Sequence, residues 1–213
     1  MTRRLSIVAW AALAAAVTLG AACGGDDKGG ATTTTPAAET SASPQARRTP
    51  FATPQINGNQ LDSAKGYSVT YPAGWKVRAN FLNTADATVD AFFEPLDGPA
   101  VAGQVQANIA IMCVLDKAPD SKQYAAAVQT MTSRLPNNSA FEVSQRQISG
   151  TAATVQTYHT ESKTDPTQPK LDQRDYLFSS DKCDWRITTT APAGQLDKYK
   201  PAFDGVLDSF KLK

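Results

Sequence analysis

Large apolar side chains alternate with Ser and Thr in residues 67–71, which read Tyr-Ser-Val-Thr-Tyr. A period of two is typical of a strand with one buried face. Pro72 and Gly74 follow at positions that favour a tight turn. We therefore expect a hairpin in which the chain returns as a second strand from Trp75.

The same alternation recurs along the chain and predicts further strands. It places Cys113 at the end of one strand, on its buried side, and Cys183 and Trp185 together on one side of another. Both cysteines can thus face the interior. Ser149-Gly150 separates the segments 143–148 and 152–160, and the short polar segment 179–182 separates 174–178 from 183–191. Each arrangement is typical of a hairpin. The expected strands are residues 89–93, 105–113, 143–148, 152–160, 174–178 and 183–191.

The period changes to that of a helix in residues 121–135. Apolar residues stand at i, i+4, i+7 and i+11 from Tyr124, and Asp120 or Ser121 can cap the first turn. Pro136 ends the pattern. This segment is expected to be an amphipathic helix whose apolar stripe packs on the core.

A second helical spacing runs from Leu196 to Phe210, but Pro201 cannot donate a backbone hydrogen bond inside a helix. The main C-terminal helix is therefore expected to begin near Pro201. Six to eight strands joined mostly by hairpins, together with these helices, predict an α+β fold: an antiparallel sheet with helices packed on it. A domain of about 150 residues, 58–213, is long enough to bury one independent core.

The first residues have the order of an export signal. Arg3 and Arg4 precede an apolar stretch, residues 5–22, which ends in small residues just before Cys23. This segment resembles a bacterial lipoprotein signal. The resemblance implies removal of residues 1–22 and attachment of lipid, with palmitate among the acyl chains, to Cys23. An uncut transmembrane helix is the alternative, and both interpretations put the rest of the chain on the extracytoplasmic face of the cell membrane.

Residues 23–57 are rich in Gly, Thr, Ala and Pro and contain few large apolar side chains. They are predicted to form a disordered tether with a span of roughly 30 to 35 Å. Without Arg3 and Arg4, the 21 Lys and Arg residues fall to 19 against 20 Asp and Glu, a formal net charge of −1. This charge balance argues against nucleic acid as a partner.

Cys113 and Cys183 remain once the lipid-bearing cysteine is set aside. In an oxidising compartment, an even pair of cysteines is expected to form a disulfide. Two buried free thiols, or a reactive or metal-binding pair, are the alternatives.

Residues 66–75 (Gly-Tyr-Ser-Val-Thr-Tyr-Pro-Ala-Gly-Trp) and 206–210 (Val-Leu-Asp-Ser-Phe) resemble the signature of the PsbP-like superfamily. With its lipid signal and Thr/Pro-rich tether, the chain is most similar within that superfamily to LpqN-type lipoproteins of actinobacteria. The resemblance implies an α-β-α sandwich, a hairpin whose Trp packs in the core, and a binding or assembly role without a shared catalytic centre.

Recognised catalytic motifs are missing from the sequence: it has no Gly-x-Ser-x-Gly, phosphate-binding glycine loop or His-Glu-x-x-His. His159 is the only histidine and is expected at the surface or in ordinary packing. Asp165, Asp172 and Asp175 are expected to be solvated rather than to bind a metal. We therefore predict that the protein is not an enzyme and has no cofactor or metal.

Two functions fit these features. The first is a lipid-anchored binding or assembly protein that presents a sheet face, or the loop at residues 161–170, to another protein of the cell envelope. The alternative is a carrier of a small apolar or lipid ligand in a cavity between sheet and helix. The residues expected to line that cavity are Phe92, Phe93, Met112 and Trp185.

Overall fold

The computed structural model describes residues 55–83, 87–97, 105–114, 118, 120–165 and 167–213. The predicted signal, Cys23 and nearly all of the predicted tether lie outside the described residues. Within the described ranges, no helix combines the length and apolar character needed to cross a membrane.

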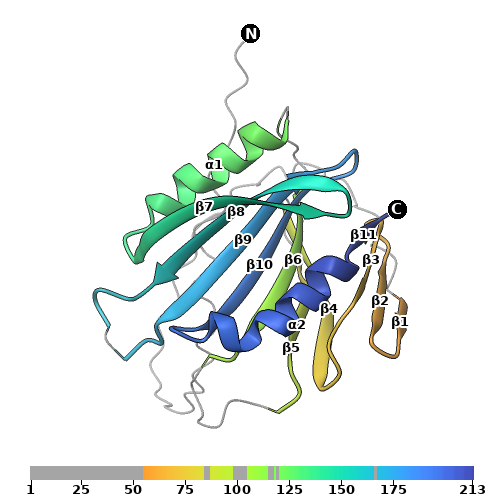
Figure 1. Cartoon of the computed structure of the whole chain (residues 1–213), viewed down its shortest axis with the longest axis horizontal. Helices are drawn as coiled ribbons and strands as arrows, with labels where there is room; N and C mark the ends of the chain where they lie inside the picture. Colours follow the sequence, from red (N-terminus) through yellow and green to blue (C-terminus); the bar gives the residue numbers. More distant parts are fainter. Residues whose placement is uncertain (1–54, 84–86, 98–104, 115–117, 119, 166) are drawn as a thin grey trace, which may run out of the picture. The chain divides into compact units, whose positions relative to one another are not determined.

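The largest element is a seven-stranded sheet in which every neighbouring pair is antiparallel (Figure 1). Six of its strands correspond to the six strands predicted from residue 89 onward, although β6 starts at Asn108 rather than at 105 and β10 at Asp184 rather than at 183. In spatial order the strands are β4 (Trp75–Asn83), β5 (Ala87–Pro95), β6 (Asn108–Val114), β10 (Asp184–Pro192), β9 (Leu171–Ser179), β8 (Thr151–Thr160) and β7 (Asn138–Ile148).

A smaller, four-stranded sheet contains the beginning and the end of the described fold. Its strands, in spatial order, are β1 (Gln55–Asn57), β2 (Gln60–Ser63), β3 (Tyr67–Thr70) and β11 (Lys211–Leu212). The expected hairpin between residues 67–71 and Trp75 is therefore wrong. The turn does form, with the Trp75 amide donating to the Pro72 carbonyl at 3.2 Å, but it leads the chain from the small sheet into the large one.

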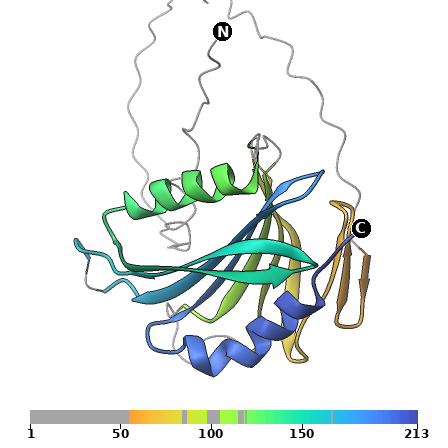
Figure 2. The ribbon, with the colours of Figure 1, turned by 45° about the horizontal axis from the view of Figure 1, so that its top comes forward.

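Two α-helices lie on opposite faces of the seven-stranded sheet (Figure 2), which confirms the expected α-β-α arrangement for the described residues. Helix α1 (Ser121–Ser133) begins as predicted, because the Asp120 carboxylate accepts a hydrogen bond from the Gln123 amide at 2.9 Å. We call the two faces of the sheet the α1 face and the α2 face.

Helix α2 (Leu196–Ser209) starts five residues earlier than expected and contains Pro201. A proline inside a helix costs about 3 kcal/mol through its missing donor and its clash with the preceding turn. Here that cost falls near the start of the helix. Leu196 and Tyr199 are partly buried against the core, and this packing helps to offset the cost and extends the helix toward its N-terminus.

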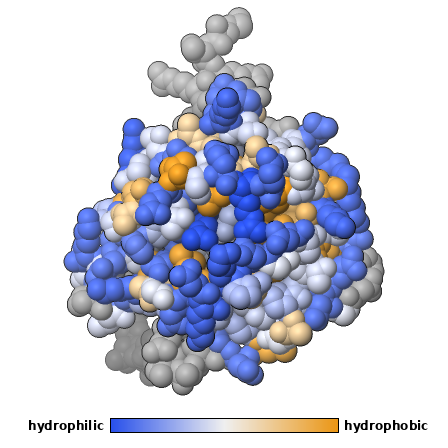
Figure 3. All heavy atoms as spheres, viewed as in Figure 1, coloured by the Kyte–Doolittle hydropathy of each residue, from blue (hydrophilic) through white to orange (hydrophobic). Residues whose placement is uncertain are grey.

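The hydrophobic core lies on the α2 face, where aromatic rings join three elements. Trp185 of β10 meets Tyr67 of β3 at 5.3 Å between ring centroids and Phe210, next to α2, at 5.7 Å. Phe210 in turn stacks on Tyr67 at 4.9 Å. All three side chains are buried. With these rings inside, the surface in Figure 3 is mainly hydrophilic and its apolar areas are scattered.

Cys113 and Cys183 form a disulfide, as predicted. The reason is register: Cys113 is paired with Trp185 across β6 and β10, and Cys183 shares the parity of Trp185. Both sulfur-bearing side chains therefore point into the core on the α2 face.

Replacing both residues, Cys113→Ala with Cys183→Ala, is expected to lower the free energy of unfolding by about 4 kcal/mol, because the bond joins residues 70 positions apart. Denaturant unfolding of the whole chain measures this. Reductant should destabilise the wild type similarly and leave the variant unchanged. A variant as stable as the oxidised wild type would contradict the expectation.

Candidate functional site

The α1 face of the sheet is polar where the helix covers it. Residues of β8, β9 and β10 that point toward α1 include Gln156, Tyr158, Asp175, Arg186 and Thr188, as the cross-strand pairs show. A sheet buried under a helix normally presents apolar side chains there. The polar groups of this buried layer must be paired or hydrogen-bonded, because burying them without partners would cost stability.

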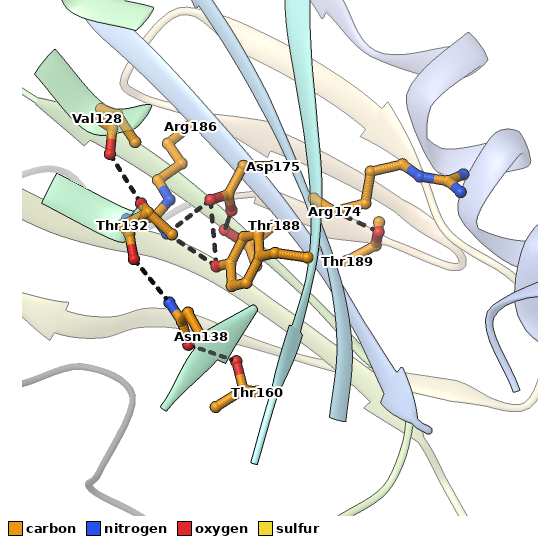
Figure 4. Close-up of polar contacts among 10 residues, drawn as sticks. Val128, Thr132, Asn138, Thr160, Arg174, Asp175, Arg186, Thr188 and Thr189 are labelled. Atoms are coloured by element: carbon orange, nitrogen blue, oxygen red, sulfur yellow. Dashed lines mark hydrogen bonds and ion pairs between the residues drawn. The ribbon is translucent and has the colours of Figure 1, made fainter. Parts of the chain in front are cut away.

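Asp175 is the centre of the layer and is completely buried. Its carboxylate accepts hydrogen bonds from Thr188 Oγ1 at 2.6 Å and Arg186 Nη2 at 2.8 Å (Figure 4), and from Tyr158 Oη at 3.3 Å. Arg186 Nη2 also lies 3.4 Å from Tyr158 Oη. Charge-assisted bonds of this kind satisfy a buried carboxylate that would otherwise be very costly.

The ionisation of the layer follows from this geometry. Burial alone would lower the pKa of Arg186, but the Asp175 carboxylate opposes it and holds that pKa above its usual range. Burial raises the pKa of Tyr124 and Tyr158 well above the ordinary value for a tyrosine. The guanidinium is thus charged and both phenols are protonated over the whole physiological pH range.

Polar contacts also fasten the end of α1 to the sheet. Thr132 Oγ1 donates to the Val128 carbonyl within the helix at 2.8 Å, and Asn138 Nδ2 donates to the Thr132 carbonyl at 3.1 Å (Figure 4). Thr160 then donates to the Asn138 side chain at 2.9 Å. The helix is held by a chain of hydrogen bonds that reaches β7 and β8.

Three buried polar atoms of the layer have no hydrogen-bond partner among the described residues: Tyr124 Oη, Gln156 Oε1 and Arg186 Nε. They supply two donors and one acceptor around the ion pair. A small uncharged molecule with both donor and acceptor capacity, such as water, can satisfy them.

An exposed aromatic cluster lies farther along the same face, on β4 and β5. Phe81 is 42% exposed and stacks on Phe92 with 4.8 Å between ring centroids. The Arg78 guanidinium carbon lies 4.4 Å from the Phe81 centroid and 5.0 Å from that of Phe92. Glu94 holds Arg78 in place through an ion pair of 3.2 Å. We call Arg78, Phe81, Phe92 and Glu94 the Phe81 patch.

The four residues expected to line one ligand cavity lie on different faces. Phe92 and Met112 point to the α1 face, since they share the parity of residues paired with Arg186. Phe93 and Trp185 belong to the core on the α2 face. Adjacent residues of a strand point in opposite directions, so the sheet itself separates Phe92 from Phe93 and the four do not form one lining.

The only histidine is joined to an aspartate rather than to a cysteine. His159 Nδ1 contacts Asp172 Oδ1, and the other carboxylate oxygen of Asp172 accepts from the Gly194 amide at 2.6 Å. Asp172 and Asp175 are buried, so the expectation that both are solvated is wrong. Asp165 is at the surface, and hydrogen bonds from Thr167 lower its pKa.

No group of three or more His, Cys, Asp or Glu side chains that could hold a metal ion occurs within the described ranges. Each buried carboxylate has its own partners: Asp175 binds Arg186, and Asp172 binds His159 and a backbone amide. Asp184, also buried, accepts from Ser179 Oγ at 2.5 Å and from the Ala118 amide at 2.6 Å.

Hydrophobic periodicity alone does not predict this polar layer. One signal was available: Asp175 and Arg186 each interrupt a strand at positions where a strand buried on both faces would be apolar. Because Asp175 and Arg186 lie on the two strands of one predicted hairpin and carry opposite charges, an ion pair between them could have been predicted. Their burial under α1 depends on tertiary packing.

Comparison with known proteins gives one family and several similar folds. The family model described as PsbP-like protein matches residues 31–212. No curated protein sequence matches the chain.

Among solved structures, cyanobacterial PsbP (CyanoP) of Synechocystis is 15% identical, with 75% of this chain and 98% of that chain covered and a TM-score of 0.47. LpqN of Mycobacterium tuberculosis, described as involved in cell envelope biogenesis, is 13% identical, with 76% and 90% covered and a TM-score of 0.46. A protein of Bacteroides thetaiotaomicron is 14% identical, with a TM-score of 0.47 and 74% of this chain covered; this chain spans about half its length, 49%.

Breaking the buried ion pair tests the account of the polar layer. Asp175→Ala is expected to lower the free energy of unfolding by about 3 to 5 kcal/mol, because it leaves Arg186 charged, buried and unpaired. Denaturant unfolding measures the loss. Replacing both partners, Asp175→Leu with Arg186→Met, should cost clearly less.

The matched control is Asp208→Ala, which removes an exposed carboxylate from its ion pair with Arg146. Exposed pairs contribute at most about 1 kcal/mol. Equal losses in the single and double variants of the buried pair would show that the pairing of charges is not what matters there.

Proposed function

The chain belongs to the PsbP-like protein family, and from that premise we propose that it is a lipid-anchored, extracytoplasmic binding and assembly protein that presents its folded domain to another protein of the cell envelope. The role proposed is binding rather than catalysis. It is supported by the way the buried charges are used, since Asp175 and Asp172 are both committed to internal partners.

Location outside the cytoplasm is supported by two independent features. The sequence before Cys23 has the charged, apolar and small-residue order of an export signal. The disulfide between Cys113 and Cys183 suits an oxidising compartment. Two or more acyl chains on Cys23 would give durable attachment to the membrane, whereas one chain gives only marginal binding.

The Phe81 patch is the observation that carries the binding role. A large aromatic side chain exposed to water is costly to leave uncovered, and aromatic and arginine side chains contribute most of the energy at many protein interfaces. Stacking on Phe92 and the ion pair of Arg78 with Glu94 hold the cluster in one arrangement. Little conformational entropy would then be lost when a partner covers it.

Substitution within the patch tests the proposal. Chemical crosslinking in intact cells, followed by purification of the protein, should return a reproducible envelope partner. Phe81→Ala is expected to reduce its recovery at least tenfold, because loss of an interface aromatic typically weakens binding by about 2 kcal/mol. Arg78→Ala should act in the same direction.

Leu96→Ala is the matched control, since it shortens another exposed apolar side chain that lies outside the Phe81 patch. Recovery of the partner should be unchanged with this variant. The proposal fails if no partner is reproducible, or if Phe81→Ala and Leu96→Ala behave alike.

The anchor has a separate test. Intact mass of the protein from membranes should equal the chain from residue 23 onward plus fatty-acyl groups, and Cys23→Ser should move the protein out of the membrane fraction. Unmodified Cys23 in protein recovered from the soluble fraction would contradict the anchoring and leave the binding role to be judged by the Phe81 patch alone.

A further inference from the structure

The seven-stranded sheet ends in two strands, β4 and β7, each with a neighbour on one side only (Figure 1). Such an edge presents unpaired backbone N–H and C=O groups, to which another strand can add. Proteins commonly protect these edges with charged side chains, prolines or irregular register. The two edges of this sheet differ in that protection.

Edge strand β4 carries two of these protective features. Lys76 and Arg78 stand two residues apart and are exposed, and the register with β5 shifts between Ala79 and Leu82. An incoming strand would meet two cations and an irregular backbone. Self-pairing along β4 would also bring like charges together, which is unfavourable.

Edge strand β7 is irregular only at its beginning. Its register with β8 shifts between Ser139 and Glu142, and Ala140 has a φ of +53°. From residue 142 to 148 the pairing is continuous, and this stretch contains neither Lys nor Pro. Arg146, its one cation, is held in ion pairs with Asp204 and Asp208 of α2.

The turn after β7 determines which backbone groups point outward. Ser149 and Gly150 both have positive φ, +52° and +75°, the signature of a two-residue type I′ hairpin. The flanking pair, Ile148 with Thr151, therefore exchanges both hydrogen bonds. Alternation from this pair directs the N–H and C=O groups of Val143, Gln145 and Gln147 away from β8.

These three residues form the open edge of β7. In the part of the chain that the structure describes, no backbone group donates to or accepts from them on that side. All three side chains are exposed, Val143 to 58%. The edge is thus regular, accessible and nearly free of charge.

We propose that β7 pairs antiparallel with β7 of a second copy of this chain, with Gln145 on the twofold axis. In this register Gln145 faces the partner's Gln145, and Val143 faces the partner's Gln147. All of these residues have outward backbone groups, so each pair can exchange both hydrogen bonds. A twofold axis at Val143 would require pairing through the irregular beginning of β7, and an axis at Gln147 would require pairing through the turn.

The side chains are compatible with this register. Ser144 faces the partner's Arg146, and Glu142 faces the partner's Ile148, so no like charges stand directly opposite one another. Glu142 is diagonal to the partner's Arg146, which is favourable. The two Arg146 residues are also diagonal to each other, but each guanidinium is already paired with Asp204 and Asp208 of its own α2. The Gln145 amides can hydrogen-bond to each other across the axis. A twofold interface of this kind closes after two copies and leaves no further edge of β7.

A cysteine at the axis tests the register directly. In the whole chain, kept in detergent micelles, Gln145→Cys should give a disulfide-linked dimer on mild oxidation, because directly opposed residues lie about 5.5 Å apart between Cα atoms. The wild type measures any background from Cys23. Gln147→Cys alone should add no dimer, whereas mixing it with Val143→Cys should.

Gln145→Pro provides a second, independent readout. It removes an outward N–H group but no hydrogen bond to β8, so the fold should keep its thermal stability within a few degrees. Sedimentation in micelles of known mass should show the wild-type chain as a dimer and this variant at least tenfold weaker in self-association. A monomeric wild type, or equal crosslinking from Gln145→Cys and Gln147→Cys, would overturn the proposal.

Discussion

Packing of Trp185 against Tyr67 and Phe210 is the interaction on which the rest of the structure depends. It brings together the seven-stranded sheet, the four-stranded sheet and the end of α2, three parts that share few backbone hydrogen bonds. Aromatic rings of this size bury much apolar area and favour offset or edge-on contacts. The disulfide lies beside them, since Cys113 is the cross-strand neighbour of Trp185.

The large sheet therefore has two faces of different character. Its α2 face is dry and aromatic and supplies most of the hydrophobic stabilisation. Its α1 face carries the ion pair of Asp175 and Arg186 under the helix and the Phe81 patch beyond it. A face that is not required for the core can carry polar and exposed aromatic groups, which is where a binding role is most easily accommodated.

Local patterns were enough to predict the strands of the large sheet, the start of α1 and the joining of the two cysteines, since alternation and capping are properties of neighbouring residues. They could not reveal that β3 and β4 enter different sheets, because Pro72 and Gly74 specify a turn but not a partner. The start of α2 before Pro201 and the burial of Asp172 and Asp175 depend on packing between distant segments. The proposed lining of Phe92 and Phe93 was wrong for a local reason: neighbours on a strand face apart.

The order of elements along the chain has a consequence for biogenesis. Phe210 and β11, which complete the aromatic core and close the small sheet, come last among the described elements. Until these last residues have been synthesised, the nascent chain lacks a complete aromatic core, and its fold is therefore incompletely stabilised. If the chain is exported, as proposed above, machinery that threads extended polypeptide would receive it before this core is complete.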